Sequence, residues 1–206
     1  MRLDTEKQIK EIKQSFRQIM DGKVAQSMRE KGLDYHLNWG ATLPRLREKA
    51  DVIGKNYDLA IALWKENVRE CKILATMIMP PDEVLPEVID IWMEQTPTQE
   101  IAEQAAFNLY QHLPFAAEKA YTWIASEKEL YQLCGFHILS RLFMNGQEPN
   151  ERGINELIDQ TLAALQGEGI AVKKAAMSSI QRFAALGIVY ERIAKSALKQ
   201  ANLDFL

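Results

Sequence analysis

A carboxylate flanked by an amide and aromatic rings is the most chemically suggestive pattern in this 206-residue chain. Gln99, Glu103, Phe107 and Tyr110 are spaced at i, i+4, i+8 and i+11, so they share one face if the segment is helical. This mixture of groups favours a recognition surface. The alternative is that Glu103 is a solvated surface residue and that Phe107 packs on the next helix.

A second set of residues that could do chemistry is basic. If the second helices of the pairs described below line the concave side of the fold, several of these residues would form a groove that neutralises phosphates. The alternative is a set of solvated faces and i,i+4 ion pairs. The candidates are Arg45, Arg47, Arg69, Lys72, Arg141, Lys173, Lys174 and Arg182.

The sequence lacks the usual patterns of metal and nucleotide chemistry. Its histidines, His36, His112 and His137, are isolated from one another and from Cys71 and Cys134. No HExxH, CxxC, EF-hand, Walker A, GxGxxG or GxSxG pattern occurs. We therefore expect no metal and no cofactor, and the sequence argues against nucleotide hydrolysis and serine hydrolase chemistry.

Helices must position the candidate residues, because almost every segment has apolar residues at helical spacing and none alternates like a strand. Trp64, Trp92 and Trp123 each lie near the end of such a segment. Each is followed by a short polar junction and a second helical segment. Repeated helix–turn–helix units predict an α-solenoid, a fold that usually presents a long surface to a large partner.

Breaks at Pro80-Pro81, Pro114 and Asn145-Gly146 separate four predicted helix pairs. The pairs are 57–65 with 67–79, 82–93 with 98–113, 115–124 with 126–145, and 150–165 with 169–186. Further helices are expected at 4–20, 23–31, 43–54 and 188–201. Uneven spacing favours HEAT-like pairs over a tetratricopeptide array. We predict one all-α, HEAT-like solenoid domain over 1–206, with N-terminal helices in 1–55, the pairs in 57–186 and a capping helix in 188–206.

Composition limits the setting of the protein. The net charge of −3 and the pI of about 5.7 are poor matches for a dedicated nucleic-acid binder, although a locally basic face would still attract phosphates. No apolar run approaches the ~18 residues that span a membrane, and the start of the chain has no apolar stretch of a secretory signal. The two cysteines are interpreted as small buried residues, which predicts a reduced, cytoplasmic location. The lack of a long apolar run predicts no membrane partner.

Several short motifs resemble those of the AlkD-like DNA alkylation repair family, which is built of HEAT-like repeats. Residues 38–50 (NWGATLPRLREKA) resemble its "G-V-x-x-P-x-L-R-x-I-A" stretch. Further similarities follow in matching order over roughly residues 25–185. Residues 59–64 resemble "L-A-x-x-L-W", and residues 70–75 resemble "E-x-R-x-L-A". Trp92 and residues 123–126 resemble "W" and "W-x-x-S", and residues 174–176 resemble the start of "K-A-I-G-W".

The resemblance implies a concave surface that binds duplex DNA. Active members of that family are glycosylases that excise cationic alkylated bases without flipping the base into a pocket. They use a carboxylate and tryptophans to stabilise the cationic deoxyribose, which is sound electrostatic and cation–π chemistry. The family also contains members that bind unusual DNA structures and excise nothing.

This chain departs from the active pattern at the site itself. The family's "W-D-x-x-D" falls on residues 99–103, where Glu103 keeps a carboxylate but Gln99 replaces tryptophan. Its "W-x-R-R" falls near Tyr131, with the arginines lost, and the tryptophan of "K-A-I-G-W" falls on Ser178. Each loss commonly costs about 1–3 kcal/mol of binding or catalysis, which argues against efficient excision.

We therefore predict a protein that binds damaged or structured DNA on a concave basic face. If the chain is an enzyme, it is a DNA N-glycosylase that releases alkylated purines, with Glu103 as the catalytic carboxylate and Gln99, Phe107 and Tyr131 shaping the site. The predicted phosphate contacts are Arg45, Arg47, Lys72, Arg141, Lys173, Lys174 and Arg182. The alternative is a HEAT-repeat scaffold for a protein partner without DNA activity. No constellation of residues supports a metabolic enzyme.

Overall fold

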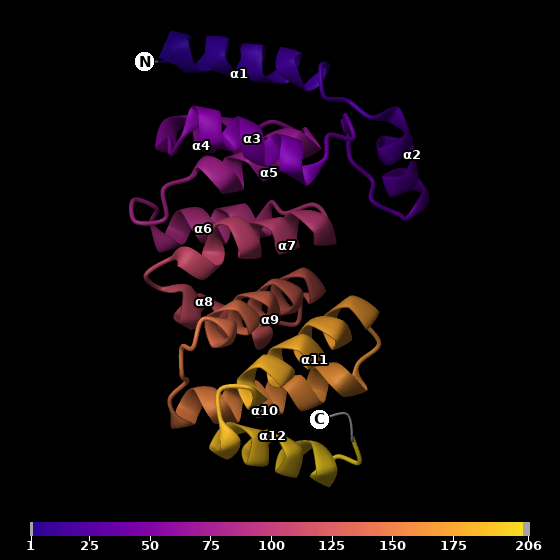
Figure 1. The fold of residues 1–206 in the computed structure, drawn as a ribbon, viewed down its shortest axis with the longest axis vertical. Helices are drawn as coiled ribbons and strands as arrows, with labels where there is room; N and C mark the ends of the chain where they lie inside the picture. The colour runs from indigo at the N-terminus through magenta and orange to yellow at the C-terminus, as the bar shows by residue number, and fades with distance from the viewer. Residues whose placement is uncertain (1, 204–206) are drawn as a thin grey trace. The chain divides into compact units, whose positions relative to one another are not determined.

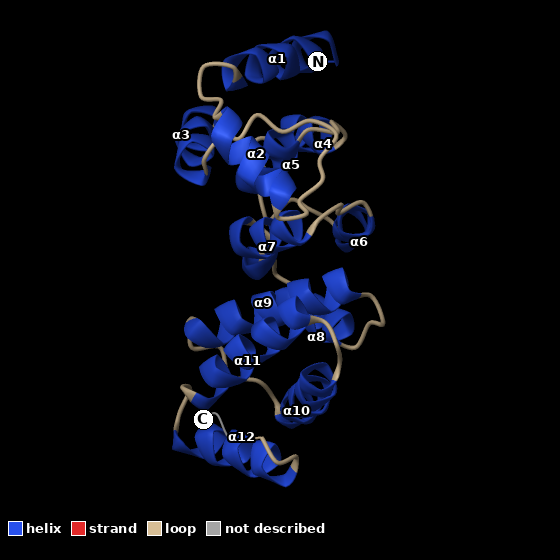
Figure 2. Cartoon of the chain, turned by 90° about the vertical axis from the view of Figure 1, so that its right-hand side faces the viewer, coloured by secondary structure: helices blue, strands red, loops and turns tan. Residues whose placement is uncertain are grey.

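The computed structural model describes residues 2–203 of the chain. Within that range it contains twelve α-helices, one 3-10 helix and no strand, apart from an isolated bridge between Leu37 and Val68 (Figure 1 and Figure 2). The all-α prediction is therefore confirmed. In the same range, no helix combines the length and the apolar character needed to cross a bilayer.

Contacts divide the chain into two compact units, Met1–Leu109 (unit 1) and Tyr110–Leu206 (unit 2), which are described separately below. Unit 1 contains α1 (Arg2–Phe16), α2 (Gly22–Glu30), α3 (Leu43–Ile53), α4 (Tyr57–Trp64), α5 (Arg69–Ile78), α6 (Pro86–Glu94) and α7 (Gln99–Asn108). Unit 2 contains η1 (Tyr110–His112), α8 (Ala116–Ile124), α9 (Glu129–Met144), α10 (Glu151–Gln166), α11 (Ile170–Ala184) and α12 (Ile188–Gln200). The single-domain expectation for 1–206 stays a prediction.

The helices start and stop close to the predicted breaks. The side chains of Asn56, Thr98 and Asn150 cap α4, α7 and α10 by accepting hydrogen bonds from backbone N–H groups of the first turn. A cap of this kind contributes about 1 kcal/mol. Pro86 occupies the first turn of α6, where its missing N–H costs nothing.

Three predicted helices have wrong boundaries. The helix predicted over 82–93 begins only at Pro86 and ends at Glu94. The first helix begins at Arg2 and ends at Phe16 rather than covering 4–20. The segment predicted as one helix over 98–113 is α7 followed by the 3-10 turn η1, because Leu109 leaves the helical region at φ −129° and ψ −59°. Tyr110 therefore does not continue the face that carries Gln99 and Glu103.

The core of unit 1 contains a stack of two tryptophans from successive pairs. The rings of Trp64 and Trp92 lie 4.3 Å apart between centroids and only 3° from parallel. The indole Nε1 of Trp64 donates to Gln95 Oε1 at 3.1 Å, just beyond the end of α6. Aromatic pairs of this kind contribute about 0.5–1.5 kcal/mol beyond their buried area, so the stack ties α4 to α6.

Unit 2 is held by apolar and aromatic packing. At Gly135 of α9, a Cβ would lie 2.8 Å from the carbonyl oxygen of Ala120, so glycine allows α9 to approach α8 closely. Trp123 meets Tyr110 edge to face at a centroid distance of 5.4 Å. Phe183 of α11 is fully buried and completes the core beside α9.

Candidate nucleic-acid interface

The second helices of each unit pack against one another in chain order. In unit 1, α5 contacts α3 on one side and α7 on the other; in unit 2, α9 packs against α11. The first helices α8 and α10 also contact each other. The predicted site residues lie on α3 and on these second helices, with Gln99, Glu103 and Phe107 in unit 1 and Tyr131 in unit 2.

Charge is distributed unequally between first and second helices. The helix α11 carries Lys173, Lys174 and Arg182 and no carboxylate. Among the first helices, α6 and α10 carry three carboxylates each and α4 and α8 carry one each, and the four helices contain only two cations, Lys119 and Arg152. A polyanion would therefore be attracted to α11 and repelled by the first helices, although the net charge of the whole chain is −3.

Two of the three cations of α11 lie on one face of the helix. Lys174 and Arg182 are exposed, and their spacing of eight residues, with Ser178 halfway between them, keeps all three on the same side. The hydroxyl of Ser178 lies 3.2 Å from that of Ser140 on α9, within hydrogen-bonding distance. Lys173 is half-buried on the neighbouring face. This part of α11 presents two solvent-accessible cations next to the surface of α9.

The predicted residues of α9 are both half-buried. Nη1 of Arg141 lies 3.7 Å from the sulfur of Met144. The ring of Tyr131 meets Trp123 edge to face at 5.9 Å between centroids, and the ammonium of Lys128 lies 5.0 Å from the centroid of Tyr131. Lys128 is thus a cation beside an aromatic ring of the predicted site that the sequence interpretation missed.

On α7, the predicted carboxylate and amide interact. Gln99 Nε2 donates to Glu103 Oε1 at 2.7 Å, as the i,i+4 spacing allows. Gln99 is exposed, while Glu103 and Phe107 are half-buried. The three side chains therefore form an accessible stripe with one negative charge.

A buried ionic network fixes the start of α7. Arg69 of α5, only 1% exposed, donates from Nε and Nη2 to the two carboxylate oxygens of Glu100 at 2.8 and 2.6 Å. The hydroxyl of Tyr35 donates to Glu100 Oε2 at 2.6 Å. A bidentate arginine–carboxylate pair is strong and sets orientation as well as distance, so it holds α7 in register with α5.

The network keeps both partners charged. Burial opposes ionisation of Glu100, but the hydrogen bonds and charge of Arg69, together with the bond from Tyr35, outweigh it and lower the pKa of Glu100. Burial likewise opposes the charge of Arg69, and its contacts with Glu100 and Glu70 outweigh burial and raise its pKa. Glu100 is thus neutralised within the protein, and Glu103 is the carboxylate of α7 on the accessible stripe.

The same network anchors the loop before α3. Glu70 is fully buried and accepts hydrogen bonds from the backbone N–H groups of Trp39 and Ala41 at 3.1 and 3.2 Å. Gly40, at φ +71°, sits so close to the backbone of Asp21 that a Cβ would lie 2.0 Å from the carbonyl oxygen. Only glycine fits there, so the loop and the start of α5 form one rigid corner.

Two of the basic candidates are buried rather than exposed: Arg69, at 1%, and Lys72, which is only 8% exposed. For Lys72 the surroundings explain why. Its Nζ donates to the carbonyl oxygen of Trp64 at 2.9 Å and lies 4.4 Å from the centroid of the Trp64 ring. Burial lowers the pKa of Lys72. This geometry favours a structural role, in which the ammonium caps α4, over a phosphate contact.

The predicted cations of α3 are on the surface. Arg45 and Arg47 are exposed, and Arg45 donates to Glu48 at 2.9 Å. Exposed pairs of this kind contribute about 0–1 kcal/mol, so Arg45 can exchange its carboxylate for another anion at little cost. The histidines, cysteines and carboxylates of the described residues form no group of three or more that could hold a metal ion.

Comparison with known proteins supplies a context for this geometry. A solved structure described as "a new family of proteins related to the HEAT-like repeat DNA glycosylases with affinity for branched DNA structures" has the same fold, with a TM-score of 0.82. The likeness covers 93% of this chain and 82% of the other at 17% identity, and it confirms the HEAT-like repeat architecture. No curated protein matches the sequence. The sequence model of the family described as "DNA alkylation repair enzyme" matches residues 12–176, and the chain belongs to that family.

Proposed function

We propose that this protein binds duplex or branched DNA, with the exposed cations of α11 as its main phosphate contacts. The observation that carries the proposal is the charge separation between α11, which has three cations and no carboxylate, and the carboxylate-rich first helices. Phosphate neutralisation provides most of the affinity of DNA-binding proteins and depends on the local field rather than on net charge.

Other cations extend the proposed contacts. Arg141 belongs to α9, which packs against α11, and Arg45 and Arg47 on α3 are exposed in unit 1. Lys72 remains in the proposed set only as a residue that supports α4 and α5, because its ammonium is bonded to a backbone carbonyl. The proposed interface therefore depends more on unit 2 than on unit 1.

Branched DNA is the substrate class that we propose first. The structurally similar protein is described as having affinity for branched DNA structures. The changes at Gln99, Tyr131 and Ser178 support the same choice, because none of them is the tryptophan that the resemblance leads one to expect at a base-excision site. An aromatic ring beside a cationic sugar contributes about 0.5–2 kcal/mol, and Gln99 and Ser178 cannot provide that contribution.

Base excision, where it occurs, is assigned to Glu103. An anionic side chain beside the sugar stabilises the positive charge that develops as the bond to the base breaks. Gln99, which is bonded to Glu103, and Phe107, one turn further along, would orient the carboxylate and exclude water on the α7 stripe. Tyr131 is the aromatic group that we propose for unit 2.

The proposal is tested by fluorescence anisotropy with a four-way junction, a linear duplex and a methylated duplex of the same base composition. We expect the junction to bind most tightly and all three affinities to fall steeply as salt rises. Tighter binding of the methylated duplex than of the junction would favour base release as the function instead. No binding at low salt would contradict the proposal and favour the protein-scaffold alternative.

The catalytic assignment has its own test, a single-turnover assay of base release from alkylated DNA. If the wild type releases bases, Glu103→Gln should abolish release and leave the melting temperature unchanged, because the side chain is half-exposed. Glu94→Gln is the matched control, since it removes an exposed carboxylate of the neighbouring helix α6. Undiminished release by Glu103→Gln would end the assignment.

A further inference from the structure

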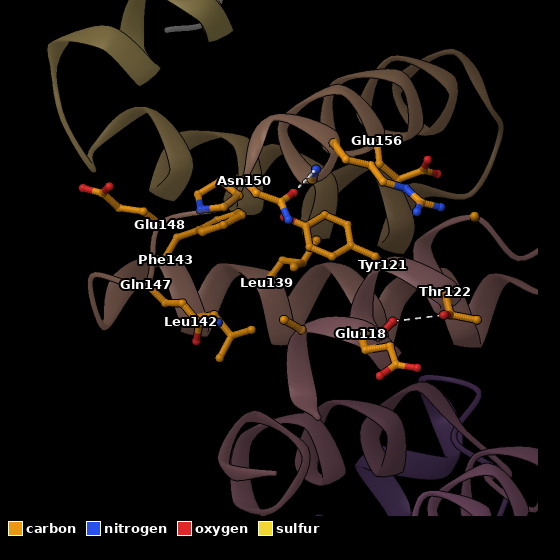
Figure 3. A pocket seen from close by; sticks show the side chains of 15 residues that line it. Glu118, Tyr121, Thr122, Leu139, Leu142, Phe143, Gln147, Glu148, Asn150 and Glu156 are labelled. Atoms are coloured by element: carbon orange, nitrogen blue, oxygen red, sulfur yellow. Dashed lines mark hydrogen bonds between the residues drawn. The ribbon is translucent and has the colours of Figure 1, made fainter. Parts of the chain in front are cut away.

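Unit 2 contains a cavity that the proposed DNA interface does not use. It lies between α8, α9 and α10 and has a volume of about 610 Å³ (Figure 3). Sites for small organic ligands are typically about 300–1,000 Å³. Its described lining includes residues from these three helices and from the 147–150 loop, and none from α11.

The cavity has an apolar floor. Leu139, Leu142 and Phe143 of α9 line it from one side, and the ring of Tyr121 lines it from α8. Leu139, Leu142 and Phe143 are buried, so the floor belongs to the packed core of the unit. A flat or aliphatic ligand body would gain hydrophobic and aromatic contacts there.

The lining charges of the cavity are mostly negative. Glu118, Glu148 and Glu156 line it from three different segments, and Arg152 is the single cation of the lining. Glu156 Oε1 also accepts a hydrogen bond from Gln160 Nε2 at 3.1 Å, which holds that carboxylate in place. This excess of carboxylates repels phosphates and carboxylate ligands and attracts cations.

The wall also contains a polar atom without a partner. The hydroxyl of Tyr121 is buried and makes no hydrogen bond within the described residues. Burial raises the pKa of Tyr121 to about 12, so the hydroxyl keeps its proton at neutral pH. The ring lies so close to α10 that a Cβ at Gly153 would be 2.8 Å from the hydroxyl oxygen. Because glycine at position 153 has no side chain, it leaves room for the ring of Tyr121.

We propose that this cavity binds a small organic cation, an amine or guanidinium carried on a flat apolar body. The apolar body would lie on Leu139, Phe143 and Tyr121, and the lining carboxylates, which include Glu118 and Glu156, would attract the cationic group. A cation beside an aromatic ring adds a further attraction. The proposal does not depend on DNA binding, because no cation of α11 lines the cavity.

Three probes of nearly equal shape test the charge preference: 2-phenylethylamine, the uncharged 2-phenylethanol and the anionic 3-phenylpropionate. Binding to the full chain is followed by NMR chemical-shift titration of labelled leucine methyl groups. We expect the amine to bind on the order of tenfold more tightly than the alcohol, and the acid to bind least. Three results would overturn the proposal: equal binding of amine and alcohol, tighter binding of the acid, or no chemical-shift change up to about 10 mM amine. That concentration is a weak limit for a site of this size.

Substitutions locate the site. The double variant Glu118→Gln, Glu156→Gln should weaken amine binding on the order of tenfold and leave alcohol binding unchanged. Glu151→Gln is the matched control, because Glu151 is exposed on α10 and does not line the cavity. Gly153→Ala, which would push the Tyr121 ring towards the cavity, should weaken both probes. An equal loss of amine affinity in the Glu151→Gln control would contradict the assignment. Unchanged amine affinity in the double variant would contradict it as well, because either result places the amine elsewhere.

Discussion

The two second helices α7 and α11 show how differently the two units are built. The charged residues of α7 are Glu100 and Glu103, and the helix has no cation of its own. The charged residues of α11 are all cations. A buried arginine holds α7 in place through Glu100, whereas α11 is held by apolar packing that includes the buried ring of Phe183.

This difference separates two tasks that a DNA-binding surface must perform. Attraction of phosphates is concentrated on α11, where the cations are accessible and no carboxylate opposes them. A carboxylate such as Glu103 would be repelled by phosphates, so its position has to be fixed by contacts within the protein. The bidentate pair of Arg69 and Glu100 provides that support one turn before Glu103.

The largest expected effect is on the support of α7. Arg69→Met removes the cation between the buried Glu70 and the half-buried Glu100, and should lower the free energy of unfolding by about 3–5 kcal/mol. Urea denaturation measures this loss. In the control, Arg45→Met removes an exposed partner of Glu48 and should cost about 0–1 kcal/mol. Equal effects of the two substitutions would show that the buried pair does not hold unit 1 together.

A smaller effect is expected in the dependence of stability on pH. The pKa of Glu100 is lower in the folded protein than its usual value of 4.5, so its contribution is complete above that value and is lost as the pH falls through the folded pKa. Glu100→Gln should lower the free energy of unfolding by about 1–3 kcal/mol at pH 7 and flatten its decline in acid.

Urea titrations of both proteins between about pH 7 and pH 3 provide the measurement. Amide hydrogen exchange adds a spatial control, because Arg69, Glu70 and Glu100 lie in unit 1 whereas α9 and α11 belong to unit 2. If the free energy of unfolding of Glu100→Gln falls in acid as steeply as that of the wild type, other groups control the pH dependence of unit 1.

The smallest expected effect is on DNA affinity. Glu103→Gln removes a negative charge from the accessible stripe of α7 and should tighten DNA binding by a few-fold, less than about 1 kcal/mol, because exposed charges are screened. Anisotropy titrations at low salt measure it, with Glu94→Gln on α6 as the control. Weaker binding by Glu103→Gln would mean that this carboxylate contacts DNA through a favourable hydrogen bond.

Local sequence signals predicted most of the fold. Proline at 80, 81 and 114 and the Asn145-Gly146 pair end helices for reasons that involve neighbouring residues alone, and Thr98 and Asn150 cap helices as their side chains allow. The end of α7 was missed because Leu109 has no unfavourable helical propensity. Its non-helical conformation coincides with a long-range contact of the next residue, Tyr110, with Trp123, which local sequence cannot reveal.

The candidate site was less predictable, because its support is long-range. Arg69 and Glu100 are 31 residues apart, and no periodicity links them. Lys72 was predicted as a phosphate contact because it belongs to a second helix that was expected to line a basic groove. In the structure its ammonium lies against the ring of Trp64. Tyr35 belongs to a loop whose aromatic content was evident, but its bond to Glu100 depends on how that loop returns to α7.

The most direct test of the account is the salt dependence of DNA binding by two double variants of unit 2. Lys174→Gln, Arg182→Gln removes the exposed cations of α11, and Lys119→Gln, Arg152→Gln removes the same charge from the first helices. The account predicts that the first variant reduces the slope of log K against log salt by about 2, while the second leaves it unchanged. Equal slopes for the two variants would contradict the claim that α11 is the phosphate-binding helix.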